Sequence, residues 1–148
     1  MQELTLAMIK PHLLREYEDL AAVETILSYY RREGLRVVAT RRFQFSKDLA
    51  EEFYHDHFGK PFFQGLVDEM TSGECIALLL QGEDAINKVR QINGATDSSQ
   101  AEVGTIRHLY GHKKLCPQNA VHGSDGPKSA AQEIKLVFGD LTKFELNS

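Results

Sequence analysis

Cys75-Ile76-Ala77-Leu78-Leu79-Leu80 is the stretch that decides the fold, because it is an unbroken apolar run that follows the turn signal Ser72-Gly73. Short continuous apolar runs of this kind are typical of strands that are buried on both faces of a sheet. Leu4 to Ile9, near the N-terminus, has apolar groups on both faces as well. The sequence therefore predicts a sheet whose central strands are covered on both sides.

The segments around these two strands show helical spacing instead. Leu20, Val23, Leu27 and Tyr30 share one face of a helix predicted over 18–33, which ends at Gly34. Further helices are predicted from the signals at their ends, namely a Ser46 cap before a helix that runs to about Asp56, Pro61 at a first helical position, Glu83-Asp84 before a helix that stops at Gly94, and Pro127 at the start of a last helix.

Leu35 to Phe45 alternates, which predicts a strand with Leu35, Val37, Ala39, Phe43 and Phe45 on one apolar face. Residues 95–105 are predicted to form a loop, 106–110 fit a short helix or a short strand, and 120–122 fit a short final strand. This order predicts an α+β sandwich of about four strands covered by helices, with residues 1–148 as a single domain. Because few strong strands are present, a doubly wound parallel sheet is disfavoured.

Composition narrows the class of protein. The chain has 148 residues, of which 42% are hydrophobic and 26% charged, and its formal net charge is −4. These values are typical of a globular domain and argue against a basic nucleic-acid or lipid surface. Neither a membrane helix nor a signal peptide is expected. Cys75 lies in an apolar run and Cys116 in a polar loop, so we expect no disulfide and a reducing, cytoplasmic location.

Among the six histidines, His122 has the strongest chemical surroundings. It lies in Asn119-Ala120-Val121-His122-Gly123-Ser124-Asp125-Gly126, between a predicted strand and a helix start. Gly123 leaves room beside the ring, and Ser124 or Asp125 could orient the imidazole, which would then be a competent nucleophile. The residues equally permit an incidental His122 beside a helix cap. His55 and His57 are two positions apart and would point away from each other on a helix, so they make a poor metal pair.

Cationic and aromatic residues offer ways to hold a phosphorylated ligand. Lys10 follows the first buried strand, while Arg90 and Arg107 lie near Gly94 and Gly104. Guanidinium and ammonium groups suit phosphate oxygens, although the chain contains no P-loop or GxGxxG motif. Phe62 could stack on a base, whereas we expect Phe63 in the core.

The stretch Asn119–Asp125 closely resembles the signature around the phosphorylated histidine of nucleoside diphosphate kinases. The resemblance covers almost the whole chain, because further family motifs occur in order and at near-family spacing. They are Leu4–Pro11, Phe53-Tyr54, Lys60–Phe63, Met70–Gly73, Arg90, Gly94–Thr96 and Gly104–Arg107.

That resemblance implies a ferredoxin-like α/β sandwich with a four-stranded antiparallel sheet, and a ping-pong transfer of a γ-phosphate from a nucleoside triphosphate to a diphosphate. By resemblance, His122 is the phosphorylated residue, Glu133 holds the other ring nitrogen, and Ser124 supports Glu133. Lys10 contacts the ribose 3′-OH and the phosphate, and Tyr54 braces the pocket.

The resemblance also implies how the nucleotide is held. Arg90, Thr96 and Arg107 bind the phosphates, Phe62 stacks on the base, and Asn119 bonds the ribose. Mg²⁺ travels on the phosphates without a direct protein ligand. The expected partners are nucleoside di- and triphosphates and further copies of the chain in a homo-oligomer, with no nucleic acid and no membrane.

Several positions depart from the family pattern. His12-Leu13 stands where an acidic residue or Asn and a small residue are usual, and Gly126 replaces a typical Ser. The loop 95–105 lacks prolines, and the stretch from Arg107 to His122 is slightly longer than usual, with His112-Lys113-Lys114 inside it. Dimer, tetramer and hexamer are all compatible with these departures.

Two other functions compete with an active kinase. One is a nucleotide-binding or interaction protein of the same family with weak catalysis, which the intact set of site residues disfavours. The other is a ferredoxin-like RNA-binding module, which is disfavoured because the chain is acidic and places no RNP-type aromatic pair on a strand.

Overall fold

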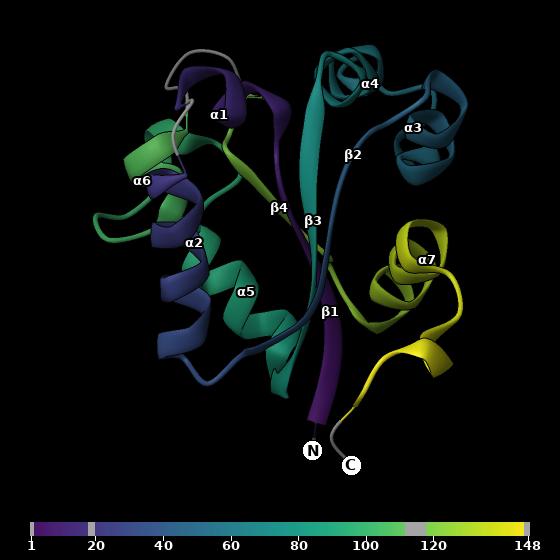
Figure 1. Ribbon diagram of the computed structural model, residues 1–148. Helices are drawn as coiled ribbons and strands as arrows, with labels where there is room; N and C mark the ends of the chain where they lie inside the picture. The colour runs from purple at the N-terminus through teal and green to yellow at the C-terminus, as the bar shows by residue number, and fades with distance from the viewer. Residues whose placement is uncertain (1, 18–19, 112–117, 147–148) are drawn as a thin grey trace.

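A computed structural model describes residues 2–17, 20–111 and 118–146. Its four strands are β1 (Gln2–Ile9), β2 (Arg36–Gln44), β3 (Glu74–Glu83) and β4 (Val121–Gly123). They form one sheet in the order β2-β3-β1-β4, and each neighbouring pair is antiparallel (Figure 1). The two apolar runs of the sequence are thus the central strands, as predicted.

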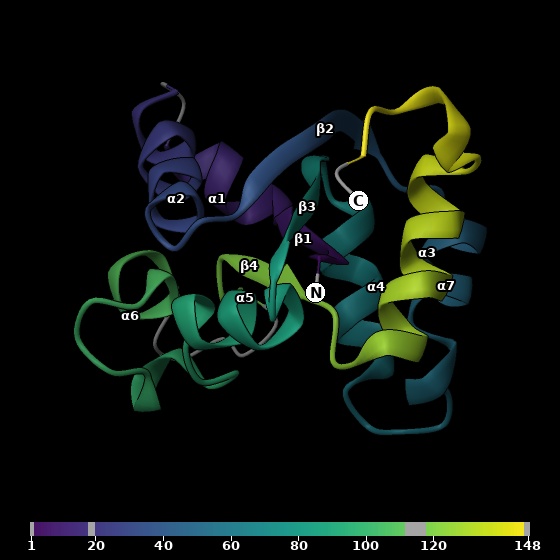
Figure 2. The same cartoon turned by 90° about the horizontal axis from the view of Figure 1, so that it is seen from below.

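Helices cover both faces of this sheet (Figures 1 and 2). One layer contains α1 (Pro11–Glu16), α2 (Ala21–Arg32), α5 (Ala85–Asn93) and α6 (Ile106–Tyr110), and the other contains α3 (Lys47–Phe53), α4 (Phe63–Thr71) and α7 (Pro127–Phe138). Short 3₁₀ turns occupy His55–His57, Ser98–Gln100 and Leu141–Lys143. Within the described residues, no helix has the length and apolar character to cross a membrane.

The central strands divide their side chains between two cores. On β3, Ile76, Leu78 and Leu80 pack against the α1/α2/α5/α6 layer. Their neighbours Cys75, Ala77 and Leu79 pack against the α3/α4/α7 layer. All six side chains are buried, as expected for a strand without a polar face. The result is the ferredoxin-like α/β sandwich with a four-stranded antiparallel sheet.

The prediction of one apolar face along β2 is wrong. A register shift lies between Val37 and Ala39 in the pairing with β3. Because one extra residue reverses the alternation, Val37 packs on the α2 side, whereas Ala39 and Phe43 pack on the α3 side.

Two predicted helix starts are also wrong, and the structure decides between helix and strand for residues 106–110. Leu20 precedes α2 and is 62% exposed, so it does not belong to the apolar face; Glu18 and Asp19 lie outside the described residues. Pro61 lies in a turn, and α4 begins at Phe63. Ile106–Tyr110 is a helix, whose start is capped by the Thr105 hydroxyl.

The structure confirms the other predicted helix ends that are marked by local signals. The Ser46 hydroxyl accepts the Leu49 N–H at the start of α3, and Pro127 is the first residue of α7. Helix α5 ends at Asn93 and is followed by the C-cap residue Gly94, which has φ +91°. Cys116 and His112-Lys113-Lys114 lie outside the described residues.

A substitution at Leu79 tests how much the core between the sheet and the α3/α4/α7 layer contributes to stability. Because the side chain is fully buried, Leu79→Ala should lower the free energy of unfolding by about 2–5 kcal/mol. The measurement is urea denaturation followed by circular dichroism. Leu20→Ala, at the exposed position before α2, is the control and should change the same quantity by less than about 0.5 kcal/mol.

Candidate active site

A cavity of about 1080 Å³ opens between the two helical layers and gathers residues from distant parts of the chain. Among the described residues, its lining comes from α3, α4, α5, α6, β4 and α7 and from loops beside these elements. Most of the site residues predicted from sequence lie on its wall: Lys10, Tyr54, Phe62, Arg90, Thr96, Arg107, Asn119, His122 and Glu133. Ser124 lies behind that wall.

His122 is held rigidly at the edge of the sheet. Its strand pairs with β1, where His122 stands opposite Met8. The ring Nε2 lies 2.7 Å from Glu133 Oε1, and the Ser124 hydroxyl donates to the same oxygen over 2.8 Å. Because Glu133 holds Nε2 and no described residue hydrogen-bonds to Nδ1, Nδ1 is the nitrogen that a ligand can reach.

Aromatic rings fix the plane of this imidazole. The Phe53 ring meets it edge-on with centroids 5.1 Å apart, and the Tyr54 ring lies 6.3 Å away at 90°. Both rings are buried, so the imidazole is confined between them and Glu133. A nucleophile held in one orientation loses little freedom when it reacts.

Asp125 does not orient the ring, contrary to one sequence-based interpretation. Its carboxylate lies 3.9 Å from Arg90 Nη2, and its carbonyl accepts from Arg90 Nη1 over 3.5 Å. This exposed pair is weak, and it keeps the Arg90 guanidinium beside the cavity.

Arg107 braces the cavity wall through its own guanidinium. It donates to the carbonyl oxygens of Gly94 and Val121 over 2.8 Å each, and to that of Asn119 over 3.3 Å. The Asn119 side-chain amide in turn donates to the Thr96 carbonyl over 2.8 Å. Together with the buried Lys10, these groups give one wall a positive charge that suits an anion.

Tyr54 contributes a hydroxyl group to the cavity wall. Its hydroxyl is buried and makes no hydrogen bond with any described residue. Burial, followed by the negative charge of Glu133, raises the pKa of this phenol, so it stays protonated. A buried hydroxyl at a cavity wall is a group that a polar ligand can satisfy.

The mouth of the cavity is aromatic. Phe62 is 48% exposed, and the His57 ring meets it at 61° with centroids 5.1 Å apart. Lys60 Nζ lies 5.7 Å from the Phe62 ring and 3.3 Å from His57 Nδ1. Phe63, by contrast, is buried in the core, as expected. An exposed ring at a cavity mouth can stack on a flat ligand.

The wall also contains polar residues that sequence reasoning did not assign to the site, among them His57 and Asn93. His57 was set aside, yet it lines the cavity beside Phe62. Asn93 is 1% exposed and accepts the Tyr30 hydroxyl over 2.6 Å, with its Nδ2 lying against Gly123. A Cβ on Gly123 would lie only 3.0 Å from that nitrogen and 2.9 Å from Val89, so this glycine is needed for close approach. The sequence shows that these two side chains are polar, but it contains no signal that places them at the cavity.

Comparisons with known proteins converge on one family. A family model described as nucleoside diphosphate kinase matches residues 3–142. The nucleoside diphosphate kinase of Staphylothermus marinus is 44% identical over 93% of this chain and 94% of its own length.

Solved structures agree with the sequence relatives. The nucleoside diphosphate kinase of Aquifex aeolicus superposes with a TM-score of 0.87 at 40% identity, covering 95% of this chain and 98% of that one. The enzyme from Halobacterium salinarum, solved in complex with CDP, has a TM-score of 0.88 at 35% identity, covering 100% of this chain and 94% of that one.

The unpaired hydroxyl of Tyr54 makes a prediction about stability. Tyr54→Phe removes a buried group that has no hydrogen-bond partner among the described residues, so the free energy of unfolding should stay unchanged or rise by about 1 kcal/mol. The matched control is Tyr30→Phe, which strips Asn93 of its donor and should lower the same quantity by about 1–2 kcal/mol. Thermal unfolding without ligand measures both. Equal losses in the two variants would mean that Tyr54 has a partner within the protein.

Proposed function

The chain belongs to the nucleoside diphosphate kinase family, and from that premise we propose that it transfers the γ-phosphate of a nucleoside triphosphate to a diphosphate through a phosphorylated His122. It is an enzyme, a phosphotransferase. The observation that carries the ping-pong route is the His122 ring, which Glu133 holds through Nε2 on the wall of a cavity that also contains Lys10, Arg90 and Arg107.

In the proposed first half-reaction, His122 Nδ1 attacks the γ-phosphorus in line. The N–P bond forms while the bond from phosphorus to the β,γ-bridging oxygen breaks, and the diphosphate leaves with that electron pair. The Nε2 proton stays on the ring, where the Glu133 carboxylate stabilises the positive charge that develops. Ser124 keeps that carboxylate in place. The second half-reaction returns the group to another diphosphate by the reverse path.

The other wall residues bind the nucleotide in this proposal. Lys10 and Arg90 meet the phosphates, and Thr96 and Arg107 complete that wall, with Arg107 also bracing the backbone. Positioning and charge stabilisation supply most of the catalysis in phosphoryl transfer, and these residues provide both.

The remaining contacts concern the nucleoside. Lys10 also reaches the ribose 3′-OH, Asn119 bonds the ribose, and Phe62 stacks on the base at the mouth. The Tyr54 hydroxyl gains its missing partner from a phosphate oxygen or from Lys10. Stacking reads no base edge, so we propose that different bases are accepted.

The donor set fits Mg²⁺ that arrives on the nucleotide. The described residues contain no group of three or more His, Cys, Asp or Glu side chains arranged to hold a metal, whereas the wall carries cations for phosphate oxygens. Mg²⁺ bound to phosphates would neutralise part of their charge. In the proposal the protein therefore supplies no direct metal ligand.

We also propose a single kinase domain over residues 1–148 that works in the cytoplasm as a homo-oligomer. The edge strand β2 supports assembly, because one side of its backbone has no neighbouring strand among the described residues. Light scattering would distinguish dimer, tetramer and hexamer.

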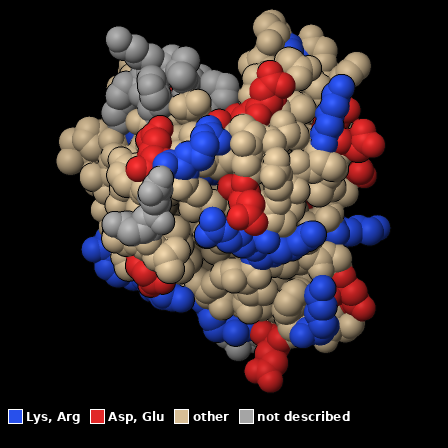
Figure 3. All heavy atoms as spheres, turned by 45° about the horizontal axis from the view of Figure 1, so that its top comes forward, with Lys and Arg blue, Asp and Glu red and all other residues tan. Residues whose placement is uncertain are grey.

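The alternatives from sequence have less support. A binding protein without catalysis would not need the hydrogen-bonded set of His122, Glu133 and Ser124. An RNA-binding module would favour a continuous basic surface, whereas Figure 3 shows Lys and Arg interspersed with Asp and Glu on the face in view.

The decisive experiment is incubation with γ-labelled ATP and Mg²⁺, with and without GDP. We expect an acid-labile label on the wild type that GDP chases into GTP, and no label on His122→Ala or when EDTA removes Mg²⁺. Absence of label on a wild type that still binds nucleotide would instead favour the binding-protein alternative.

Glu133 should matter for the rate more than for binding. Glu133→Gln keeps an acceptor for Nε2–H but lacks the negative charge, so the phosphorylation rate of His122 should fall roughly tenfold to a hundredfold, with the KM for ATP nearly unchanged. Rapid-quench kinetics measures the rate. Glu24→Gln, on the exposed side of α2, is the control. A wild-type rate in Glu133→Gln would remove Glu133 from the mechanism.

A further inference from the structure

Ala120 adopts an unusual backbone conformation immediately before β4. Its φ is +72°, in the left-handed region, and the only other described residue of this kind besides glycine is Asp84. This conformation costs an alanine roughly 1–3 kcal/mol and persists only when the surroundings impose it. Ala120 stands between Asn119 and the strand that carries His122, so whatever imposes it also shapes the cavity wall.

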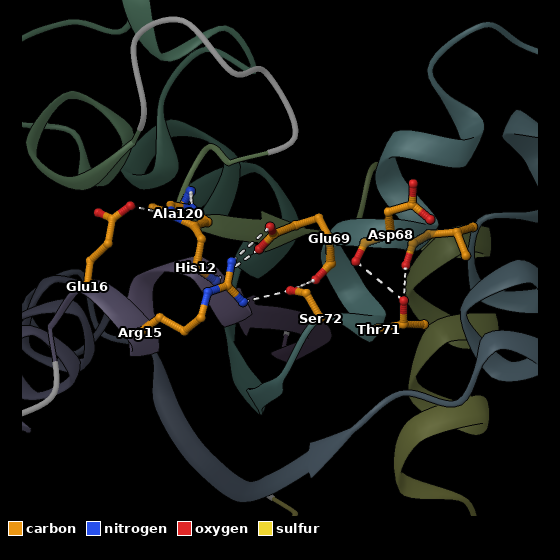
Figure 4. Close-up of polar contacts among 9 residues, drawn as sticks. His12, Arg15, Glu16, Asp68, Glu69, Thr71, Ser72 and Ala120 are labelled. Carbon is orange, nitrogen blue, oxygen red and sulfur yellow. Dashed lines mark hydrogen bonds and ion pairs between the residues drawn. The ribbon is translucent and has the colours of Figure 1, made fainter.

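Residues on both sides of Pro11 hold the backbone of Ala120. The Lys10 N–H donates to the Ala120 carbonyl over 2.8 Å. The Ala120 N–H donates to His12 Nε2, also over 2.8 Å, and His12 is only 1% exposed (Figure 4). Both polar groups of this strained residue are therefore held by the junction between β1 and α1.

His12 is tied in turn to α4. Its backbone N–H donates to Glu69 Oε2 over 2.9 Å. Arg15 lies 3.6 Å from Glu69 Oε1 and donates to the Ser72 hydroxyl over 2.7 Å (Figure 4). Burial raises the pKa of the Glu69 carboxyl, while the His12 N–H, Arg15 and Lys10 oppose that shift. Figure 4 shows one connected path from α4 through α1 to Ala120.

We propose that His12, as a neutral imidazole, is a positioning residue for phosphoryl transfer. By accepting the Ala120 N–H, it fixes the turn that places Asn119 and His122 on the cavity wall. The inference rests on the proposed kinase function and adds a residue that touches neither substrate nor His122.

The same contact makes the arrangement sensitive to acid. An imidazole accepts a hydrogen bond only through an unprotonated nitrogen, so protonation of Nε2 would end the bond to Ala120. Among the described residues, the charged groups around His12 include Glu16, whose Oε1 lies 3.6 Å from Nδ1, together with Glu69 and Arg15 and, across Pro11, Lys10.

The test is a double-mutant cycle of wild type, His12→Phe, Ala120→Gly and the double variant. His12→Phe keeps a ring but loses the acceptor, so His122 phosphorylation should slow roughly tenfold to a hundredfold, with a smaller change in KM. Glycine adopts a positive φ without strain, so Ala120→Gly should restore about tenfold of the lost rate in the His12→Phe background. In the wild-type background it should have little effect.

Two further variants separate positioning from folding. His12→Gln offers an amide oxygen that does not titrate, so it should retain near-wild-type activity at neutral pH and show a shallower acid limb than wild type. His55→Phe, at an exposed histidine outside the cavity wall, is the matched control and should behave as wild type.

The outcomes distinguish the proposals. A wild-type rate in folded His12→Phe, or a rate in the double variant that falls further, would overturn the positioning role. If His12→Phe does not fold, the acid limb of the pH–rate profile of His12→Gln decides, because an unchanged limb also overturns the positioning role.

Amide exchange gives a readout that does not depend on activity. The Ala120 amide should exchange slowly in wild type and His12→Gln and fast in His12→Phe. A wild type without phosphorylation would refute the kinase proposal alone.

Discussion

The three-residue pairing of β4 with β1 is the contact on which the rest of the site depends. It sets His122 opposite Met8 and brings the Ala120 carbonyl to the Lys10 N–H, so two residues far apart in sequence meet at one sheet edge. So short a strand holds little by itself. It is kept in place by β1, which is buried on both faces, and by hydrogen bonds at its ends, where Ser124 N–H donates to the Leu6 carbonyl.

The cavity lies where the two helical layers meet this edge. One layer supplies Glu133 and the aromatic rings around His122, and the other supplies Arg90 and Asn93. Neither layer could build the site alone, because the sheet separates their side chains. The wall is then stiffened by side chains that bind backbone: Arg107 joins the carbonyl group of Gly94, at the end of α5, to those of Asn119 and Val121, at the start of β4. Such bracing orients charged groups before a ligand arrives, which is the condition for electrostatic catalysis.

Several features of the site and of the residues that support it reduce the stability of the fold. The Tyr54 hydroxyl has no described partner, Ala120 holds a left-handed backbone, and Glu69 is buried with a raised pKa. Local departures of this kind gather at functional sites, where the surrounding core supplies the stability that they lose. The two apolar cores, continuous along β1 and β3, have that role here.

The sequence by itself determined the central strands, several helix ends and the family. Two short, mainly apolar runs favour buried strands, because they are too short for buried helices, and signals such as Ser46 and Pro127 act locally. The motif around His122, together with the order of the other motifs, was enough to indicate the family. Each strand, cap and motif is formed by residues that are close together in the chain, so the sequence alone is enough to identify it.

Only the tertiary structure decided which groups meet. The bulge in β2 moved Ala39 and Phe43 to the face opposite Val37, because register is set by pairing with β3 and not by the pattern of one strand. Asp125, which the local sequence offered as a partner for the imidazole, lies beside Arg90 instead. His57 and Asn93 reached the cavity wall, and His12 reached Ala120 across 108 residues. Hydrogen bonds need partners within about 3 Å, and only the folded chain determines which distant residues come that close.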